Sequence, residues 1–471
     1  MNQELKDYKP QSGHTLKFAI MAVIGVFLFM VPLPVGDGTF NIPLGFAINW
    51  LGGHLNSVPF GDFGLLFLLA AIVITVSFLG SVLAYTVKPG FIMNNEKLKK
   101  LFECGIVYFI SKAIGFVLVW MVFLNSTLGL SEITAFAYIL DPWDGAGLMM
   151  DLISSSGGLM AIFIILGIAI PLLTDFGLME FLGIIIRKAI KFLFTLPGRS
   201  SIDLLGSWFS SSAASVIITR NQHEKGYYTG REAAAICVNF TLVSLPFTFV
   251  VASFIGLTGH FALFYLTVTA TTLILAVIFP RIWPLRGIKD EYLPEVGKQI
   301  DEEVPQDVSM FSWAIKLASK RASQTGPLDV VKSGGSNWLS IFMDLIPVIL
   351  AWGTIALVIN NVTPIFEWIS LPFGYYMQLL QVPYALEYAP ATVVGFVDMF
   401  IPAVLLGDTA PFATRFIIGA LSIVQIIYLA ETGILILKSR IPLHIGHLAV
   451  LFVMRTILAL PIIVLFHWLL F

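Results

Sequence analysis

The sequence predicts an all-α polytopic membrane protein, with about nine transmembrane helices and two re-entrant hairpins in inverted-topology repeats. The 471-residue chain is 57% hydrophobic and only 12% charged, whereas soluble domains carry about 25% charged residues. Its mean hydropathy is +0.89. Runs of about 18 or more apolar residues recur, and each can cross a hydrocarbon core of ~30 Å as a helix. A transmembrane barrel would show short alternating segments instead, so the spans must be helices.

The composition also narrows the classes of function. A net charge of -2 argues against a nucleic-acid partner. Cys104 and Cys237 are the only cysteines and lie far apart, which argues against a disulfide framework or a metal cluster. The sequence contains no phosphate loop, nucleophile motif or metalloprotease signature. We therefore expect no enzyme and no cofactor, apart from H⁺ or Na⁺ as a coupling ion. The expected partners are the lipid bilayer and a small polar solute, and the sequence also allows a homo-oligomer.

Taken in order, the apolar runs predict spans at about 15–34, 62–88, 105–127, 157–186, 232–255, 260–283, 338–360, 411–436 and 446–470. The first run has no small-residue cleavage site after it, so it is interpreted as a retained span rather than a signal peptide. The stretch 39–54 is too short to span and is expected at the membrane interface. The predicted organisation is N-terminal helices over 1–150, a first repeat over 151–284, a linker over 285–336 and a second repeat over 337–471.

The linker is the one hydrophilic segment. It contains seven Lys/Arg and eight Asp/Glu residues, with "DEEVPQD" at 301–307 and "SGGS" at 333–336. This composition is typical of a solvent-exposed connection between two membrane halves. We also expect a short amphipathic helix around "FSWAIKLASKRA".

Lys and Arg favour the cytoplasmic side of a membrane, and their distribution predicts the orientation of the chain. Residues 113–186 contain neither, whereas 187–231 contain seven. The apolar piece at about 200–219 is therefore expected to enter from the cytoplasm and return there. Residues 341–414 again contain neither, so the broken segment 389–411 should enter from outside. The N-terminus is predicted to be cytoplasmic, in a bacterial inner membrane.

The two halves also resemble each other in sequence. "IPLLTDFGLMEFLGIIIRKAIKFLFTLPG" (170–198) aligns with "IPVILAWGTIALVINNVTPIFEWISLPFG" (346–374), and a hairpin follows in each half. Pro-bounded apolar helices can look alike by chance, but the charge pattern independently favours opposite orientations. Inverted repeats with discontinuous helices are typical of secondary transporters. A helix end inside the membrane leaves unpaired backbone groups, which are tolerated only where they line a cavity or bind something.

The stretch "LPGRSSIDLLGSWFSSSAASVIITRNQHEKGYYTGREAA" (196–235) resembles the nucleoside-recognition, or Gate, domain of bacterial membrane proteins. The whole chain resembles YjiH-type inner-membrane proteins. The Gate domain is shared with concentrative nucleoside transporters, the iron transporter FeoB and the sporulation proteins SpmA and SpmB. The resemblance implies a transport or gating role. It does not imply a substrate, because these proteins handle different cargo.

Polar residues at membrane depth are functional-site candidates. The predicted solute- or ion-binding residues are Asp175, Ser210, Ser211, Ser212, Ser215, Asn239, Thr241, Ser244, Asp398, Asp408, Gln425 and Glu431. Asp175 could be a coupling-ion site and the serines could line a hairpin tip.

Each candidate also has a structural alternative. The serines allow close helix packing. Asn239, Thr241 and Ser244 are followed by Pro246, and their side chains could bond back to helix carbonyls near a kink. Asp408 with Thr409 resembles a helix cap.

Four further sets of polar residues have expected structural roles or are candidates for a site. Arg415 and Arg455 could pair with the acids or snorkel to an interface. Lys112 is expected at the cytoplasmic end of its span. Thr229 is expected to cap the helix that contains Glu232. His444 and His447 lack a third metal ligand.

The function predicted from these features is a secondary transporter that moves a small polar solute by alternating access, coupled to H⁺ or Na⁺. The alternative is a non-transporting Gate-domain scaffold, or a subunit of a membrane complex. Two complete halves in one chain favour a self-sufficient transporter. An intramembrane enzyme would need a catalytic set that the sequence lacks.

Overall fold

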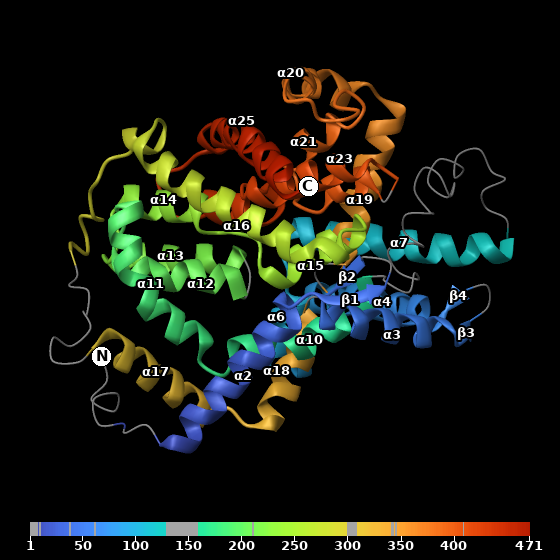
Figure 1. Ribbon diagram of the computed structural model, residues 1–471. Helices are drawn as coiled ribbons and strands as arrows, with labels where there is room; N and C mark the ends of the chain where they lie inside the picture. The colour runs from blue at the N-terminus through green and yellow to red at the C-terminus, as the bar shows by residue number, and fades with distance from the viewer. Residues whose placement is uncertain are drawn as a thin grey trace. The chain divides into compact units, whose positions relative to one another are not determined.

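The computed structural model (Figure 1) describes residue 8 and residues 11–36, 39–60, 63–128, 159–209, 212–298, 309–340, 343, 346–407 and 409–471. The chain divides into two compact units. The first unit comprises Met1–Pro43, Ala169–Val330 and Pro372–Phe471, and the second comprises Leu44–Ile168 and Val331–Leu371.

The second unit is a small helical bundle. Its elements are α3 (Pro43–Asn56), α4 (Leu65–Thr86), α5 (Gly90–Met93), α6 (Glu96–Phe102), α7 (Ile106–Leu128), α19 (Ile346–Val362) and parts of α10, α18 and α20. Helix α7 packs against both α4 and α19. The Ser77 hydroxyl donates to the Met343 carbonyl at 2.5 Å. Lys112 is buried and donates to the Leu101 carbonyl at 3.1 Å, so its charge satisfies a helix end within this unit.

The first unit contains both hairpins. Its N-terminal elements are α2 (Ser12–Met30), β1 (Leu33–Gly36) and β2 (Thr39–Asn41). The first half continues with α10 (Leu159–Thr174), α11 (Leu178–Phe194), α12 (Ser201–Phe209), α13 (Ser212–Glu224), α14 (Gly230–Asn239), α15 (Leu245–Phe254) and α16 (Phe261–Ile278). The second half has α20 (Ile365–Leu379), α21 (Pro390–Val394), α22 (Ile401–Leu406), α23 (Phe412–Val424), the π-turn η7 (Leu429–Gly433), α24 (Ile434–Leu437) and α25 (Ile445–Leu470). The strands of the described residues form two short antiparallel β-hairpins, β1–β2 in the first unit and β3–β4 (Pro59–Phe60 with Phe63–Gly64) in the second.

Both halves of the first unit follow one order: a helical hairpin, a broken helix and a long helix. Helices α12 and α13 pack against each other, as do α21 and α22. The broken helices are α14–α15 and α23–η7, and the long helices α16 and α25 pack together beside α23. The two predicted hairpins are therefore present as helical pairs. Their opposite directions of entry stay a prediction.

Four helices of the described residues are long and apolar enough to span a membrane: Ser12–Met30, Leu65–Thr86, Thr258–Gly287 and Ile445–Leu470. The pair Leu350–Asn360 and Ile365–Leu379, bent by 84°, would make a fifth span. The chain is thus a helical multi-span membrane protein. The segments predicted as spans over 157–186, 232–255 and 411–436 are each interrupted, by breaks between α10 and α11, between α14 and α15 and after α23.

The break between α10 and α11 depends on one glycine. Gly177 has a φ of +98°, and a Cβ there would lie 2.5 Å from the Ala318 carbonyl oxygen. Only glycine adopts this left-handed conformation without strain and permits such a close approach. The neighbouring helix is α17 (Met310–Gln324), so the break brings the linker helix against the first repeat.

The described part of the linker contains two helices, α17 and α18. The amphipathic helix is confirmed as α17, which buries Trp313, Ala314 and Ala318 and packs against α2 and α11. Helix α18 (Pro327–Ser340) runs through 333–336. Gly334 lies so close to the Gly167 carbonyl that a Cβ would be 2.5 Å from its oxygen, and this glycine of "SGGS" therefore serves helix packing.

Candidate functional site

The first helix break lies between α14 and α15, at residues 240–244. A helix end leaves its last carbonyls without partners. Here backbone and side-chain donors of the interruption bond to these carbonyls. The Phe240 N–H donates to the Ile236 carbonyl at 2.8 Å, and the Thr241 hydroxyl to the Cys237 carbonyl at 2.6 Å. Ser244 caps the start of α15 by accepting from the Phe247 N–H at 3.4 Å. Thr241 thus bonds back to a helix carbonyl, as the structural alternative expects, whereas Ser244 caps the next helix. Their solute-binding roles stay predictions.

The second break follows α23 and is satisfied in the same way. The Tyr428 hydroxyl donates to both the Ser422 and the Ile423 carbonyls at 2.8 Å. The Gln425 N–H donates to the Leu421 carbonyl at 3.0 Å. Thr432 accepts from the Tyr428 N–H at 3.2 Å. The two breaks therefore use one strategy, in which a side chain from the interruption turns back to the helix end.

Arg455 joins the two breaks. It lies near the middle of α25 and is fully buried. Its Nε donates to the Val424 carbonyl at 3.0 Å, and its Nη1 donates to the Val238 carbonyl and to Asn239 Oδ1, both at 2.9 Å. Its described partners are helix ends rather than acids, so the expectation that Arg455 pairs with an acid or snorkels is wrong. Asn239 is placed by the same contact and also donates to the Ala235 carbonyl at 2.8 Å.

Arg415 has a related position. Its Nη1 donates to the Ile255 carbonyl at 2.7 Å, directly after the C-terminal end of α15. The expected pairing with acids is again replaced by contact with a helix end. Both arginines act on the partial negative charge that a helix carries at its C-terminus.

Glu431 connects the second break to the first hairpin. Its Oε1 accepts from the Ala213 N–H at 3.2 Å, and the Ser212 hydroxyl bonds to the same carboxylate. Ala213 lies in the first turn of α13, where free N–H groups and partial positive charge favour an anion. The sequence predicted Ser212 and Glu431 separately, and the structure brings them together.

Asp398 and Gln425, like Glu431, belong to the second half of the first unit. Asp398 is buried, its Oδ1 accepts from the Phe400 N–H at 2.8 Å, and its charge is close enough to act on Glu431. The Gln425 side-chain amide donates to the Thr392 carbonyl and to Thr456 Oγ1, both at 2.8 Å. Gln425 Oε1 is buried without a hydrogen-bond donor among the described residues. The second half therefore contains a polar acceptor, Gln425 Oε1, and the two acids Asp398 and Glu431.

The sequence analysis missed Asp203, which organises the first hairpin. The buried Asp203 carboxylate accepts from the Thr219 hydroxyl and from the Tyr228 hydroxyl, each at 2.6 Å. The Ser215 hydroxyl donates to the Asp203 carbonyl at 2.9 Å. Ser215 thus makes a packing contact inside the hairpin, and its predicted role at a solute-lined tip stays a prediction. An acid seven residues before "SSSAAS" on a short amphipathic helix was the available signal.

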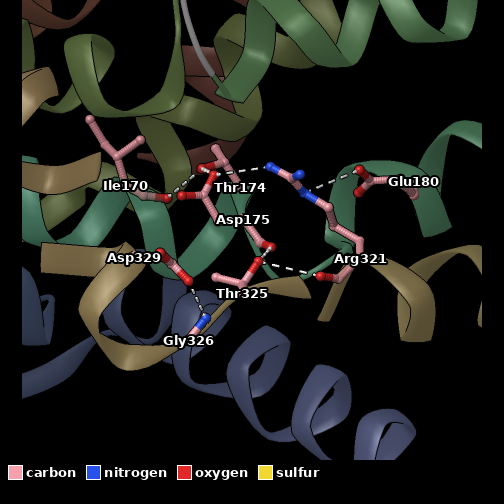
Figure 2. Close-up of polar contacts among 8 residues, drawn as sticks. All are labelled: Ile170, Thr174, Asp175, Glu180, Arg321, Thr325, Gly326 and Asp329. Atoms are coloured by element: carbon pink, nitrogen blue, oxygen red, sulfur yellow. Dashed lines mark hydrogen bonds and ion pairs between the residues drawn. The ribbon is translucent and has the colours of Figure 1, made fainter. Parts of the chain in front are cut away.

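Asp175 lies at a different place, in the α10–α11 break (Figure 2). It accepts from the Thr174 hydroxyl at 3.0 Å, and its Oδ1 is 3.9 Å from Arg321 Nη2 on α17. Arg321 Nε is also 3.8 Å from Glu180 Oε1, and Thr325 donates to the Asp175 carbonyl at 2.7 Å. The structure therefore does not place Asp175 with Glu431 and Asp398, as a shared mid-membrane acid site would require. The proposed coupling role of Asp175 stays a prediction.

Several candidates need only a brief account. Ser210, Ser211 and Asp408 lie outside the described residues. The capping box of Thr229 and Glu232 is confirmed at the start of α14. His444 caps α25 and stacks on His447, with ring centroids 3.7 Å apart. The described residues contain no group of three or more His, Cys, Asp or Glu that could hold a metal ion.

Comparison with known proteins adds a family to this geometry. The nucleoside-recognition (Gate) family matches residues 157–259. An outward-facing CNTnw variant with two substitutions aligns at 15% identity and a TM-score of 0.38, over 97% of this chain and 98% of that chain. CNTnw in an inward-facing substrate-bound state aligns at 15% identity and a TM-score of 0.41, over 96% and 98%. The chain is also 41% identical over 450 residues to an uncharacterized protein of Alkalihalophilus pseudofirmus, with 95% of this chain and 93% of that protein covered. The chain belongs to the same family as that protein, and it carries a nucleoside-recognition (Gate) domain.

Proposed function

We propose that this protein is a secondary transporter that moves a small polar solute across the bacterial inner membrane by alternating access, coupled to H⁺ or Na⁺. The observation that carries the proposal is the contact of Glu431 with Ala213 and Ser212, through which an acid of one half meets the helix start of the other half's hairpin. Discontinuous helices meeting at such a point are the layout in which secondary transporters hold solute and coupling ion.

The acids supply the coupling chemistry of this proposal. A carboxylate at membrane depth costs roughly 2.5–3.5 kcal/mol on insertion scales, unless it is protonated, paired or bound to a cation. The charge of Asp398 acts on Glu431, and two nearby carboxylates do not both stay ionised at low cost. A proton or a cation shared by this pair would be exchanged when the site opens to the other side of the membrane.

The Gate match makes nucleosides the first class of solute to test, because that family is described by nucleoside recognition. The likeness to YjiH-type inner-membrane proteins and the cytoplasmic position of the N-terminus belong to the same proposal. The buried amide of Gln425, whose oxygen accepts no hydrogen bond from the described residues, suits a solute with N–H or O–H donors.

The test is uptake into liposomes that contain the purified protein. Labelled nucleosides, nucleobases and small amino acids would each be offered under an inward H⁺ gradient, an inward Na⁺ gradient and no gradient. We expect one class of solute to accumulate under one gradient, and protein-free liposomes to accumulate none. If the whole panel fails while binding of a solute or a protein partner is measurable, the protein is a Gate-domain scaffold and the proposal is wrong.

A further inference from the structure

The most unusual group in the first unit is the buried guanidinium of Arg455. It lies at membrane depth, since α25 is long and apolar enough to span the bilayer. A buried charge without compensation is costly, and in spanning helices such a charge usually serves a function. The partners of Arg455 show what compensates it.

Two of its three described hydrogen-bond acceptors are helix-end carbonyls, and the third is the side-chain oxygen of the last residue of α14. Val424 O belongs to the end of α23, and Val238 O and Asn239 Oδ1 belong to the end of α14. Each helix end contributes partial negative charge of roughly half an elementary charge, so two ends together balance one cation. The ring of Phe279 adds a cation–π contact, with the guanidinium carbon 5.2 Å from its centroid.

Carbonyls of interrupted helices are also the groups that hold Na⁺ in transporters with broken helices. In this chain, the guanidinium of Arg455 donates hydrogen bonds to such carbonyls. We propose that Arg455 is a built-in cation: its tethered guanidinium occupies the carbonyl cage between the two helix breaks, holds the breaks together and leaves that cage closed to free Na⁺. This inference rests on the contacts alone and does not require the proposed transport activity.

A consequence follows for the two halves of the fold. One side chain holds the end of α14 and the end of α23 with separate nitrogens, so the two breaks are expected to move as one body. A free cation would dissociate during a transport cycle, whereas a covalently attached one stays. Any coupling ion must then use other groups, such as the acids Glu431 and Asp398.

The experiment measures the melting temperature of detergent-purified Arg455→Ala, which empties the cage. We expect a fall of roughly 5 °C or more, the order expected when a buried hydrogen-bonded charge is removed. Low millimolar guanidinium should restore at least half of that fall. Urea has the N–H donors without the charge, and tetramethylammonium has the charge without the donors, so neither should restore it. Arg440→Ala is the matched control, because Arg440 is exposed and pairs with Glu295 at 2.7 Å.

Each outcome of this experiment either supports the proposal for Arg455 or overturns it. Rescue of Arg455→Ala by guanidinium, with no effect on Arg440→Ala, supports the built-in cation. Equal rescue by urea, or no rescue of a folded variant, overturns it. If Arg455→Ala does not accumulate, Arg455→Lys decides, since one ammonium cannot hold both helix ends in the same geometry. A melting temperature for Arg455→Lys equal to that of the wild type would overturn the proposal.

Discussion

The carboxylate of Glu431 accepts a hydrogen bond from the backbone N–H of Ala213, at 3.2 Å and across 218 positions of the chain. The contact joins an interruption in the second half to the first turn of a hairpin helix in the first half. Neither residue has a neighbour in sequence that would indicate the other. At this contact the two halves are joined by a hydrogen bond to a carboxylate and not by packing alone.

The first prediction concerns this contact and the acid beside it. We expect Glu431→Gln to reduce gradient-driven accumulation by about tenfold or more, because a hydrogen bond to a charged group contributes about 1.5–3 kcal/mol. Asp398→Asn keeps the acceptor for the Phe400 N–H and removes only the charge, so its effect isolates electrostatics. Both variants would be measured in liposomes under imposed H⁺ and Na⁺ gradients.

The matched control for these acids is Glu295→Gln. Glu295 is 70% exposed and pairs with Arg440 outside the predicted spans, so its neutralisation should leave accumulation unchanged. Full accumulation by both Glu431→Gln and Asp398→Asn would remove the two acids from the mechanism.

The second prediction separates two serines that look equivalent in the sequence. Ser212→Ala removes the hydroxyl that bonds to Glu431, and we expect it to lower uptake while the melting temperature changes little. Ser215→Ala removes a buried bond to the Asp203 carbonyl, and we expect a loss of about 1 kcal/mol in stability with uptake retained. Reversed effects in the two assays would show that Ser215, not Ser212, faces the solute. Ser211→Leu, at the predicted tip, should abolish uptake.

The third prediction concerns the buried acid that holds the first hairpin. Tyr228→Phe leaves Asp203 with one hydroxyl donor fewer, so we expect a loss of about 1–2 kcal/mol in the free energy of unfolding. Tyr227→Phe is the control, because Arg199 stacks on the Tyr227 ring at 3.8 Å and the ring is kept. Thermal melts of the purified variants would give both values. Equal stability of Tyr228→Phe and the wild type would show that the hydroxyl contributes nothing.

The fourth prediction concerns topology. Single cysteines at Asn221 and Tyr384, in a background in which Cys104 and Cys237 are replaced, should react with an impermeant reagent from opposite sides of the membrane. Asn221 is exposed at the end of α13, and the Tyr384 side chain is 65% exposed. Labelling of both positions from one side would disprove the inverted repeat.

The sequence by itself determined the class of fold and the order of its parts. Hydrophobic run lengths and low charge indicate spanning helices whatever their packing, because the bilayer imposes a minimum length and polarity on each span. Local structure was predictable for a different reason. The Thr229–Glu232 capping box and the amphipathic α17 depend only on residues close together in the chain. The positions of both hairpins followed from polar and Pro-containing interruptions in apolar runs.

Only the tertiary structure decided which polar residues meet. Arg455 satisfies carbonyls 31 and 217 positions away, and periodicity carries no information about partners at such distances. The same holds for Ser215, whose hydroxyl turns inward to Asp203 although its neighbour Ser212 turns to Glu431. Helix breaks were hidden because Thr241, Tyr428 and Arg455 replace the missing backbone partners, and side chains that do so are read in a sequence as ordinary polar residues. A buried polar group takes whichever partner the fold brings within about 3 Å, and the fold alone sets that choice.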